Sequence, residues 1–199
     1  MTKVSLSEEE MWLVSNSDWI LTKQRIIEKV YALFGNLSAK MQLRLQQNKQ
    51  DIPPQTLQLP PKISKGERYE LLPYVVLDYP RFFSKENVFA IRTFFWWGNY
   101  FSVTLHLKGI FLQQWHNAIM KAAAEKKWKG FYFSTDGNEF SFNLDGKNYR
   151  YDDGSVHAGS ILQPAFLKIS CKISFSEWNM AEQKLMEAFE RFTGLQRNG

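Results

Sequence analysis

Residues 71–108 read LLPYVVLDYPRFFSKENVFAIRTFFWWGNYFSVTLHLK, the densest run of aromatic and β-branched residues in the chain. Such residues fit the pleated surface of a β-sheet. Within the run, Gly98 and Asn99 separate two apolar segments, and both residue types tolerate the positive φ angles of a two-residue hairpin turn. The stretch therefore predicts a central β-hairpin in which Trp97 lies opposite Tyr100.

This register divides the hairpin into two faces, because successive side chains of a strand point to opposite sides. We expect the first face to be apolar core, made of Phe94, Trp96, Phe101, Val103, Leu105 and Leu107. The second face mixes aromatic rings with hydroxyls and an imidazole, from Ile91, Thr93, Phe95, Trp97, Tyr100, Ser102, Thr104 and His106. Arg92 falls on the apolar face, so either it pairs with a carboxylate such as Asp78 or Glu86, or the register differs by one residue.

The mixed face suggests a binding site, because small-molecule sites combine apolar walls with a few placed polar groups. The candidate ligand-binding residues are Arg92, Phe95, Trp97, Tyr100, Thr104 and His106. The same mixture also occurs on half-solvated sheet faces, where aromatic and threonine pairs only stabilise neighbouring strands.

Residues 166–175, FLKISCKISF, alternate strictly and predict a second clear strand. The side chains that we expect in the core are Leu167, Ile169, Cys171, Ile173 and Phe175, and those that we expect in water are Lys168, Ser170, Lys172 and Ser174. Between the two regions, GFYFS, EFSFNL and KNYRY predict three short strands joined by Asp-Gly turns. The sheet should thus be covered on one face.

The helices are predicted from capping and periodicity. Ser7 and Glu10 have the capping-box spacing and open a short helix. A longer helix follows over residues 17–47, with an apolar stripe formed by Ile20, Ile27, Val30, Phe34, Leu37 and Met41. This stripe either packs on the sheet or forms the seam of a two-fold dimer. Two further helices are expected near residues 110–127 and 176–193.

These elements predict a single α+β domain with one mostly antiparallel, twisted sheet of about six or seven strands. The long N-terminal helix and the two further helices should pack mainly on one face. Residues 1–48 form the helical part, residues 49–66 a proline-rich connector, and residues 67–199 the sheet with its helices. We expect Tyr79-Pro80 to turn the chain at the end of a strand that begins at Leu71.

Composition sets broad limits. The net charge of +5 is mild, so nucleic-acid binding ranks last among the functions considered. The N-terminal sequence MTKVSLSEEE has no apolar signal-like region, and no apolar run is long enough for a membrane span. The single cysteine, Cys171, fits a reducing compartment. We therefore predict a cytoplasmic protein without membrane contact.

Known catalytic and nucleotide-binding motifs are missing from the sequence. The three histidines, His106, His116 and His157, lie on three different predicted elements, so we assign no metal ligand, cofactor or catalytic residue. The leading hypothesis is a non-catalytic protein that binds a small molecule or a partner through the mixed face of the hairpin. The alternatives are an enzyme with His106 as acid or base, aided by Asp78 or Arg92, and a homodimeric scaffold or regulator joined by the long helix.

Overall fold

The computed structural model describes residues 4–47, 52–135, 137–155 and 165–195. The helical elements are α1 (Glu8–Ser15), α2 (Ser17–Gln47), η2 (Pro54–Leu57), α3 (Ile110–Ala124), η4 (Phe175–Met180) and α4 (Ala181–Thr193). The strands are β1 (Lys62–Tyr69), β2 (Leu72–Phe83), β3 (Val88–Trp96), β4 (Tyr100–Lys108), β5 (Tyr132–Ser134), β6 (Tyr149–Tyr151) and β7 (Phe166–Ser174). They form one seven-stranded antiparallel sheet with the order β1-β2-β3-β4-β7-β5-β6, which confirms the predicted α+β fold.

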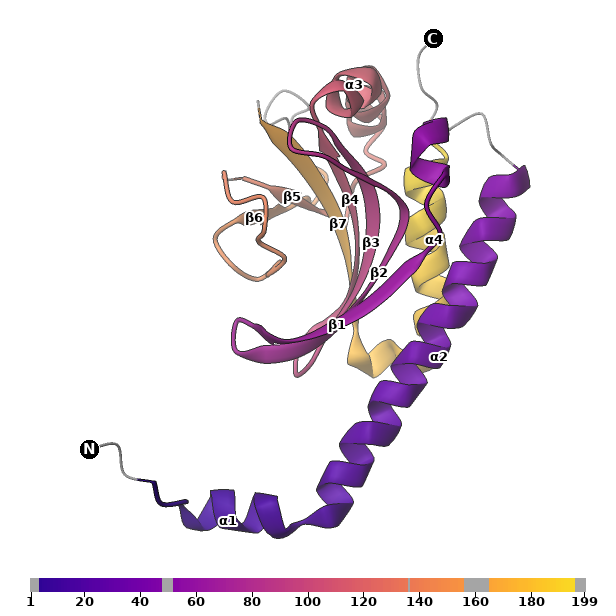
Figure 1. Ribbon diagram of the computed structural model, residues 1–199. Coiled ribbons are helices and arrows are strands. Elements are labelled where there is room, and N and C mark those ends of the chain that lie inside the picture. The colour runs from indigo at the N-terminus through magenta and orange to yellow at the C-terminus, as the bar shows by residue number, and fades with distance from the viewer. Residues whose placement is uncertain (1–3, 48–51, 136, 156–164, 196–199) are drawn as a thin grey trace.

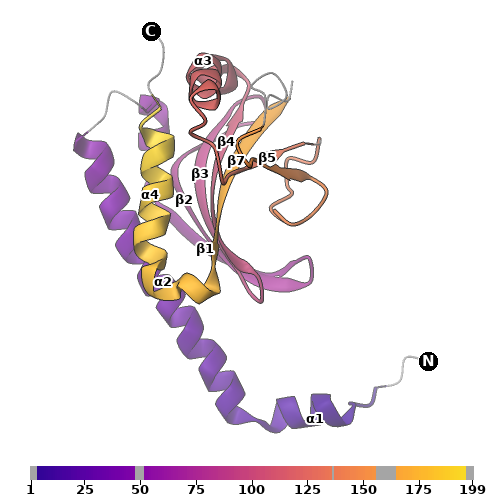
Figure 2. The same cartoon turned by 180° about the vertical axis from the view of Figure 1, so that it is seen from behind.

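The helices and one long loop lie on opposite sides of this sheet. Helices α2 and α4 run beside each other along one side, and α3 lies near one end of the sheet (Figures 1 and 2). We call this side the helix face. The other side carries Arg92, Thr104 and His106 and is partly covered by residues 138–145, and we call it the loop face. Figure 1 shows β5, β6 and the segment between them on this side, away from α2 and α4.

The hairpin register differs from the prediction by one residue. Trp96 lies opposite Tyr100, so the turn contains Trp97, Gly98 and Asn99, with Gly98 at a φ of 71°. Three-residue turns with one left-handed residue are a common alternative to two-residue turns. The predicted two-residue turn was therefore wrong, although its glycine does occupy the position that needs a positive φ.

The shift moves the side chains of β3 to the opposite faces, as a one-residue slip must. Phe95 pairs with Phe101 on the helix face, and Phe94 pairs with Ser102 on the loop face. The prediction was thus right that Phe101, Val103, Leu105 and Leu107 are core. It was wrong to place Phe94 and Trp96 on the same face, although both are buried, in a smaller apolar cluster of the loop face. The core of the helix face from this hairpin consists of Phe89, Ile91, Phe95, Phe101, Val103, Leu105 and Leu107.

The edge of the sheet also differs from the prediction. Strand β1 begins at Lys62, inside the proposed connector. Its sequence, KISKGERY, is mostly polar and lacks the apolar alternation that predicts a strand. Strand β2 does not end at Tyr79-Pro80 but continues to Phe83, with an irregular register between Asp78 and Arg81. Such bulges accommodate an extra residue and tolerate proline, so the chain bends here without leaving the sheet.

Helix α2 is continuous through Gly35 and Asn36, and the apolar stripe is only partly buried. The stripe is buried against the sheet and α4 from Val30 onward, through Val30, Phe34, Leu37, Met41 and Leu45, and Ile27 is partly buried against the same core. Ile20, in the first part of the helix, is exposed. The prediction that the stripe is core is thus confirmed for its second half. Among the described helices, none combines the length and the apolar character needed to cross a membrane.

Candidate functional site

The loop of residues 138–145 replaces the strand that EFSFNL predicted, and three tyrosines hold it over the sheet. The backbone N–H of Phe142 donates to the Tyr69 hydroxyl at 2.6 Å, and that of Leu144 donates to the Tyr100 hydroxyl at 2.7 Å. Tyr149 donates its own hydroxyl to the Ser141 carbonyl oxygen at 2.8 Å. These side chains satisfy backbone groups that would have entered strand pairing, so the segment is ordered without being a strand.

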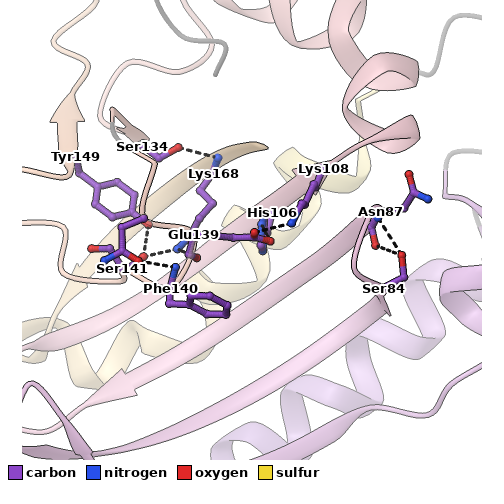
Figure 3. Close-up of polar contacts among 11 residues, drawn as sticks. Ser84, Asn87, His106, Lys108, Ser134, Glu139, Phe140, Ser141, Tyr149 and Lys168 are labelled. Carbon is purple, nitrogen blue, oxygen red and sulfur yellow. Dashed lines mark hydrogen bonds and ion pairs between the residues drawn. The ribbon is translucent and has the colours of Figure 1, made fainter. Parts of the chain in front are cut away.

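Lys168 of β7 lies beneath this loop and is fully buried. Its Nζ donates to the carbonyl oxygen of Glu139 at 3.1 Å and also to that of Ser141 (Figure 3). The ammonium group lies 3.6 Å from the centroid of the Phe142 ring, a cation–π distance. The prediction that Lys168 and Ser170 face water was wrong, because the loop covers this part of β7.

Anchoring the loop places the Glu139 carboxylate against two basic side chains of β4 (Figure 3). Its Oε2 is 2.7 Å from Lys108 Nζ, and its Oε1 is 3.2 Å from His106 Nε2. The histidine contact is close but poorly aligned, so Nε2 has no hydrogen-bond partner within the described residues. Burial, together with Lys168, Arg92 and Lys108, lowers the pKa of His106 to about 3. The imidazole is therefore neutral at pH 7.

A second ion pair crosses from β2 to β3. Arg92 Nε and Nη2 donate to the two carboxylate oxygens of Asp78, at 2.7 and 2.9 Å. The two residues are direct cross-strand neighbours, and the guanidinium carbon lies 4.9 Å from the centroid of the Phe142 ring. Both explanations considered for Arg92 thus apply: the register differs by one residue, and the side chain pairs with Asp78. The pair gives Arg92 a defined orientation.

These groups border a cleft of about 380 Å³ on the loop face. Its lining residues are Lys62, Asp78, Arg81, Phe83, Arg92, His106, Glu139, Phe140 and Phe142. Phe140 is 79% exposed, which is unusual for so large an apolar side chain. Within the described residues, no carboxylate forms an ion pair with Lys62 or Arg81, and Arg81 Nε donates to the Pro60 carbonyl oxygen at 3.2 Å. The cleft thus combines aromatic walls with two cations available to a ligand.

The structure brings together only part of the predicted ligand-binding set. Arg92 and His106 line the cleft. Tyr100 and Thr104 share their face, but the Tyr100 hydroxyl binds the loop and the Thr104 hydroxyl lies 2.8 Å from that of Ser170. Phe95 lies in the core of the helix face, and Trp97, in the hairpin turn, is partly buried and packs against that core.

Sequence reasoning missed the cleft residues that come from outside the hairpin, namely Lys62, Arg81, Phe83, Glu139, Phe140 and Phe142. In the sequence, Phe140 is one of the alternating apolar residues of EFSFNL, which predicted a strand; its exposure is a property of the folded structure alone. Lys108 and Glu139, which form an ion pair, are 31 residues apart, and no local pattern connects them.

Other reactive groups do not add chemistry to the cleft. Within the described residues, no three side chains of histidine, cysteine, aspartate or glutamate are grouped to hold a metal ion. Burial raises the pKa of the Cys171 thiol to about 11, so this cysteine is a thiol at pH 7. His116 is exposed on α3, and His157 lies outside the described residues.

No protein-family model, curated protein or solved structure matches this chain.

Proposed function

We propose that the protein binds, without chemical conversion, a small molecule that carries an anionic group and an apolar or aromatic part. The observation that carries this proposal is the cleft on the loop face, where cationic and aromatic side chains line one cavity. Its volume of about 380 Å³ falls within the range typical of ligand sites. The protein supplies both kinds of group that such a ligand would need.

Lys62 and Arg81 would hold the anionic group. Guanidinium groups match the geometry of carboxylates and phosphates, and lysine adds a point charge. Arg92 borders the same cavity but is already engaged by Asp78, so it contributes positive potential more than free donors. The anion is expected at the end of the cleft formed by β1 and β2.

Phe140 and Phe83 would contact the apolar part of the ligand. Both rings line the cleft and are exposed in the described structure, so covering them with an apolar group removes apolar surface from water. Glu139, at the other side of the cleft, would repel a second anion near His106. The arrangement thus favours ligands with one charged end.

The competing enzyme hypothesis requires His106 to act as acid or base. His106, Arg92 and Asp78 do line the same cleft, as that hypothesis needs. However, a histidine whose pKa is lowered to about 3 is a weak base at neutral pH. Its nearest charged partner is Glu139 and not Asp78. Binding is therefore the function that the cleft supports better.

The first test is a thermal-shift and calorimetry series with benzoate, phenyl phosphate and inorganic phosphate. A compound that binds the folded state must raise the melting temperature. Calorimetry on the variants Arg81→Gln and Lys62→Gln should show affinity for the best compound lowered by about tenfold or more, the usual value of a charge-assisted hydrogen bond. Lys85→Gln, in the exposed turn between β2 and β3, is the matched control and should leave affinity unchanged.

Two results would overturn the proposal. One is the absence of stabilisation by all three compounds. The other is binding that Arg81→Gln and Lys62→Gln affect no more than the control does. Conversion of a bound compound, detected by mass spectrometry and lost in His106→Gln, would instead support the enzyme.

A further inference from the structure

Helix α1 and the first part of α2 form an arm, residues 8–29, that extends beyond the sheet (Figures 1 and 2). Within the described chain, none of the α1 residues is buried, and the buried residues of α2 begin at Val30. Within the described residues, only the last turn of the arm touches the core, through the partly buried Ile26 and Ile27, and residues between Ile20 and Glu28 border a cavity shared with the β1–β2 hairpin. The rest of the arm, and all of α1, has no buried side chain in the described structure. The cleft lies on the loop face of the sheet, so the arm is a separate surface.

The arm nevertheless carries large apolar side chains. Trp12 is 62% exposed and Trp19 is 44% exposed. The other exposed apolar side chains of the arm are Met11, Val14, Ile20 and Leu21. Six large exposed apolar side chains between residues 11 and 21 are a higher concentration than the single ones of an ordinary surface, and such concentrations typically mark an interaction segment.

Helix α1 is also too short to be stable by itself. It has eight residues, and isolated helices below about 12 residues are marginal in water. Its capping box, in which Ser7 and Glu10 bond reciprocally, supports only its first turn. A partner that covers Met11, Trp12 and Val14 would supply the missing stabilisation.

The charges of the arm indicate what that partner is. Helix α1 contains Glu8, Glu9 and Glu10 and no basic residue. The following segment, residues 17–29, contains three basic side chains, Lys23, Arg25 and Lys29, against two acidic ones, Asp18 and Glu28. The arm is thus acidic at its start and net basic further along, so it is complementary to an antiparallel copy of itself.

We propose that the arms of two copies pack antiparallel about a two-fold axis. Helix α1 of one copy lies against residues 17–29 of the other, and the reverse contact follows by symmetry. A two-fold interface needs a self-complementary patch, which the acidic and basic halves of the arm provide. The three glutamates of α1 disfavour an anionic lipid surface as the alternative occupant.

Sedimentation of the full chain across the micromolar range tests the proposal. The unaltered protein should be a dimer that dissociates on dilution. Trp12→Ala combined with Trp19→Ala should raise the dissociation constant roughly thirtyfold or more, as expected for aromatic hot spots. Because both side chains are exposed, circular dichroism should show that the sheet and the remaining helices stay folded.

Charge reversal gives the sharper test. Glu8→Lys with Glu9→Lys, and separately Arg25→Glu with Lys29→Glu, should each weaken the homodimer by placing like charges together. An equal mixture of the two variants should form a heterodimer, because both symmetry-related contacts then pair opposite charges. Lys126→Glu with Lys127→Glu, beyond α3, is the matched control and should leave the dimer intact.

Three outcomes would overturn the proposal. The first is a monomer at every concentration, and the second is a dimer that the arm substitutions leave unchanged. The third is a monomer that floats with vesicles of phosphatidylcholine and phosphatidylglycerol and loses this property in the Trp12→Ala, Trp19→Ala variant. That result would assign the arm to lipid instead.

Discussion

The helix face and the loop face belong to the same sheet, but different interactions cover them. On the helix face, α2, α3 and α4 bury a continuous apolar core that includes Phe34, Phe101 and Phe189. On the loop face, a smaller apolar cluster lies around Phe94 and Trp96, and one loop is held over it. The Tyr100 hydroxyl accepts a hydrogen bond from the backbone of this loop, and Lys168 donates one to it.

If the cleft binds a ligand as proposed, this difference separates the surface that stabilises the fold from the surface that binds. Apolar packing is non-directional and fills space, so it leaves little room for a ligand. Hydrogen bonds and ion pairs are directional, and here they hold Glu139 and Arg92 at the border of an open cleft. We therefore expect substitutions on the helix face to affect mainly folding, and those of the solvent-accessible cleft side chains Lys62, Arg81 and Phe140 to affect mainly binding.

The largest expected effect is on the helix face. Phe101 is fully buried and has ring contacts with Phe95, Phe175 and Trp178. Phe101→Ala should lower the free energy of unfolding by about 3 to 5 kcal/mol, measured by urea denaturation. Phe140→Ala, at the exposed cleft wall, should change stability by less than about 0.5 kcal/mol. Equal losses for the two variants would remove the contrast between the faces.

The next largest effect concerns the ion pair between β2 and β3. The Asp78 side chain is 8% exposed and that of Arg92 is 25% exposed. Asp78→Ala should lower the free energy of unfolding by about 2 to 3 kcal/mol. This loss is somewhat smaller than that expected on removing one partner of a fully buried pair, because water reaches part of the unpaired guanidinium. Adding Arg92→Met should recover part of this loss. Strict additivity of the two costs would show that the pair is not coupled.

The pH dependence of stability should reveal the neutral His106. As the pH falls below about 6.5, the unfolded chain binds a proton that the folded protein accepts only near pH 3, so acid favours unfolding. Between pH 7.5 and 5, this linkage should remove about 2 kcal/mol from the free energy of unfolding. Urea titrations at several pH values should show a shallower acid loss in His106→Gln. His116→Gln, at an exposed position, should keep the original slope.

The smallest effect is expected from one loop anchor. Tyr100→Phe removes the hydroxyl that accepts a hydrogen bond from the buried Leu144 N–H. The free energy of unfolding should fall by about 1 to 2 kcal/mol. Hydrogen exchange should show loss of protection at the backbone amides of Phe142 and Leu144, while the amides of α4 remain protected. Equal loss in α4 would mean that the two faces do not open independently.

Local periodicity determined much of the fold. The alternation of Leu105 and Leu107 in β4, and of Leu167, Ile169 and Ile173 in β7, correctly identified side chains of the helix face. The capping box at Ser7 and the buried second half of α2 were also confirmed. These features depend on the repeats of a strand and a helix, which neighbouring residues specify by themselves.

The tertiary structure alone decided the hairpin register, the burial of Lys168 and the composition of the cleft. A turn of two or three residues fits the same Gly98-Asn99 pair, and only packing on both faces selects between them. Lys168 alternates like a solvent-facing residue, but its burial depends on a loop about 30 residues away in the chain. Contacts over such separations leave no local pattern in the sequence. Local sequence patterns therefore determined the strands of the sheet, whereas long-range contacts in the folded chain determined the cleft.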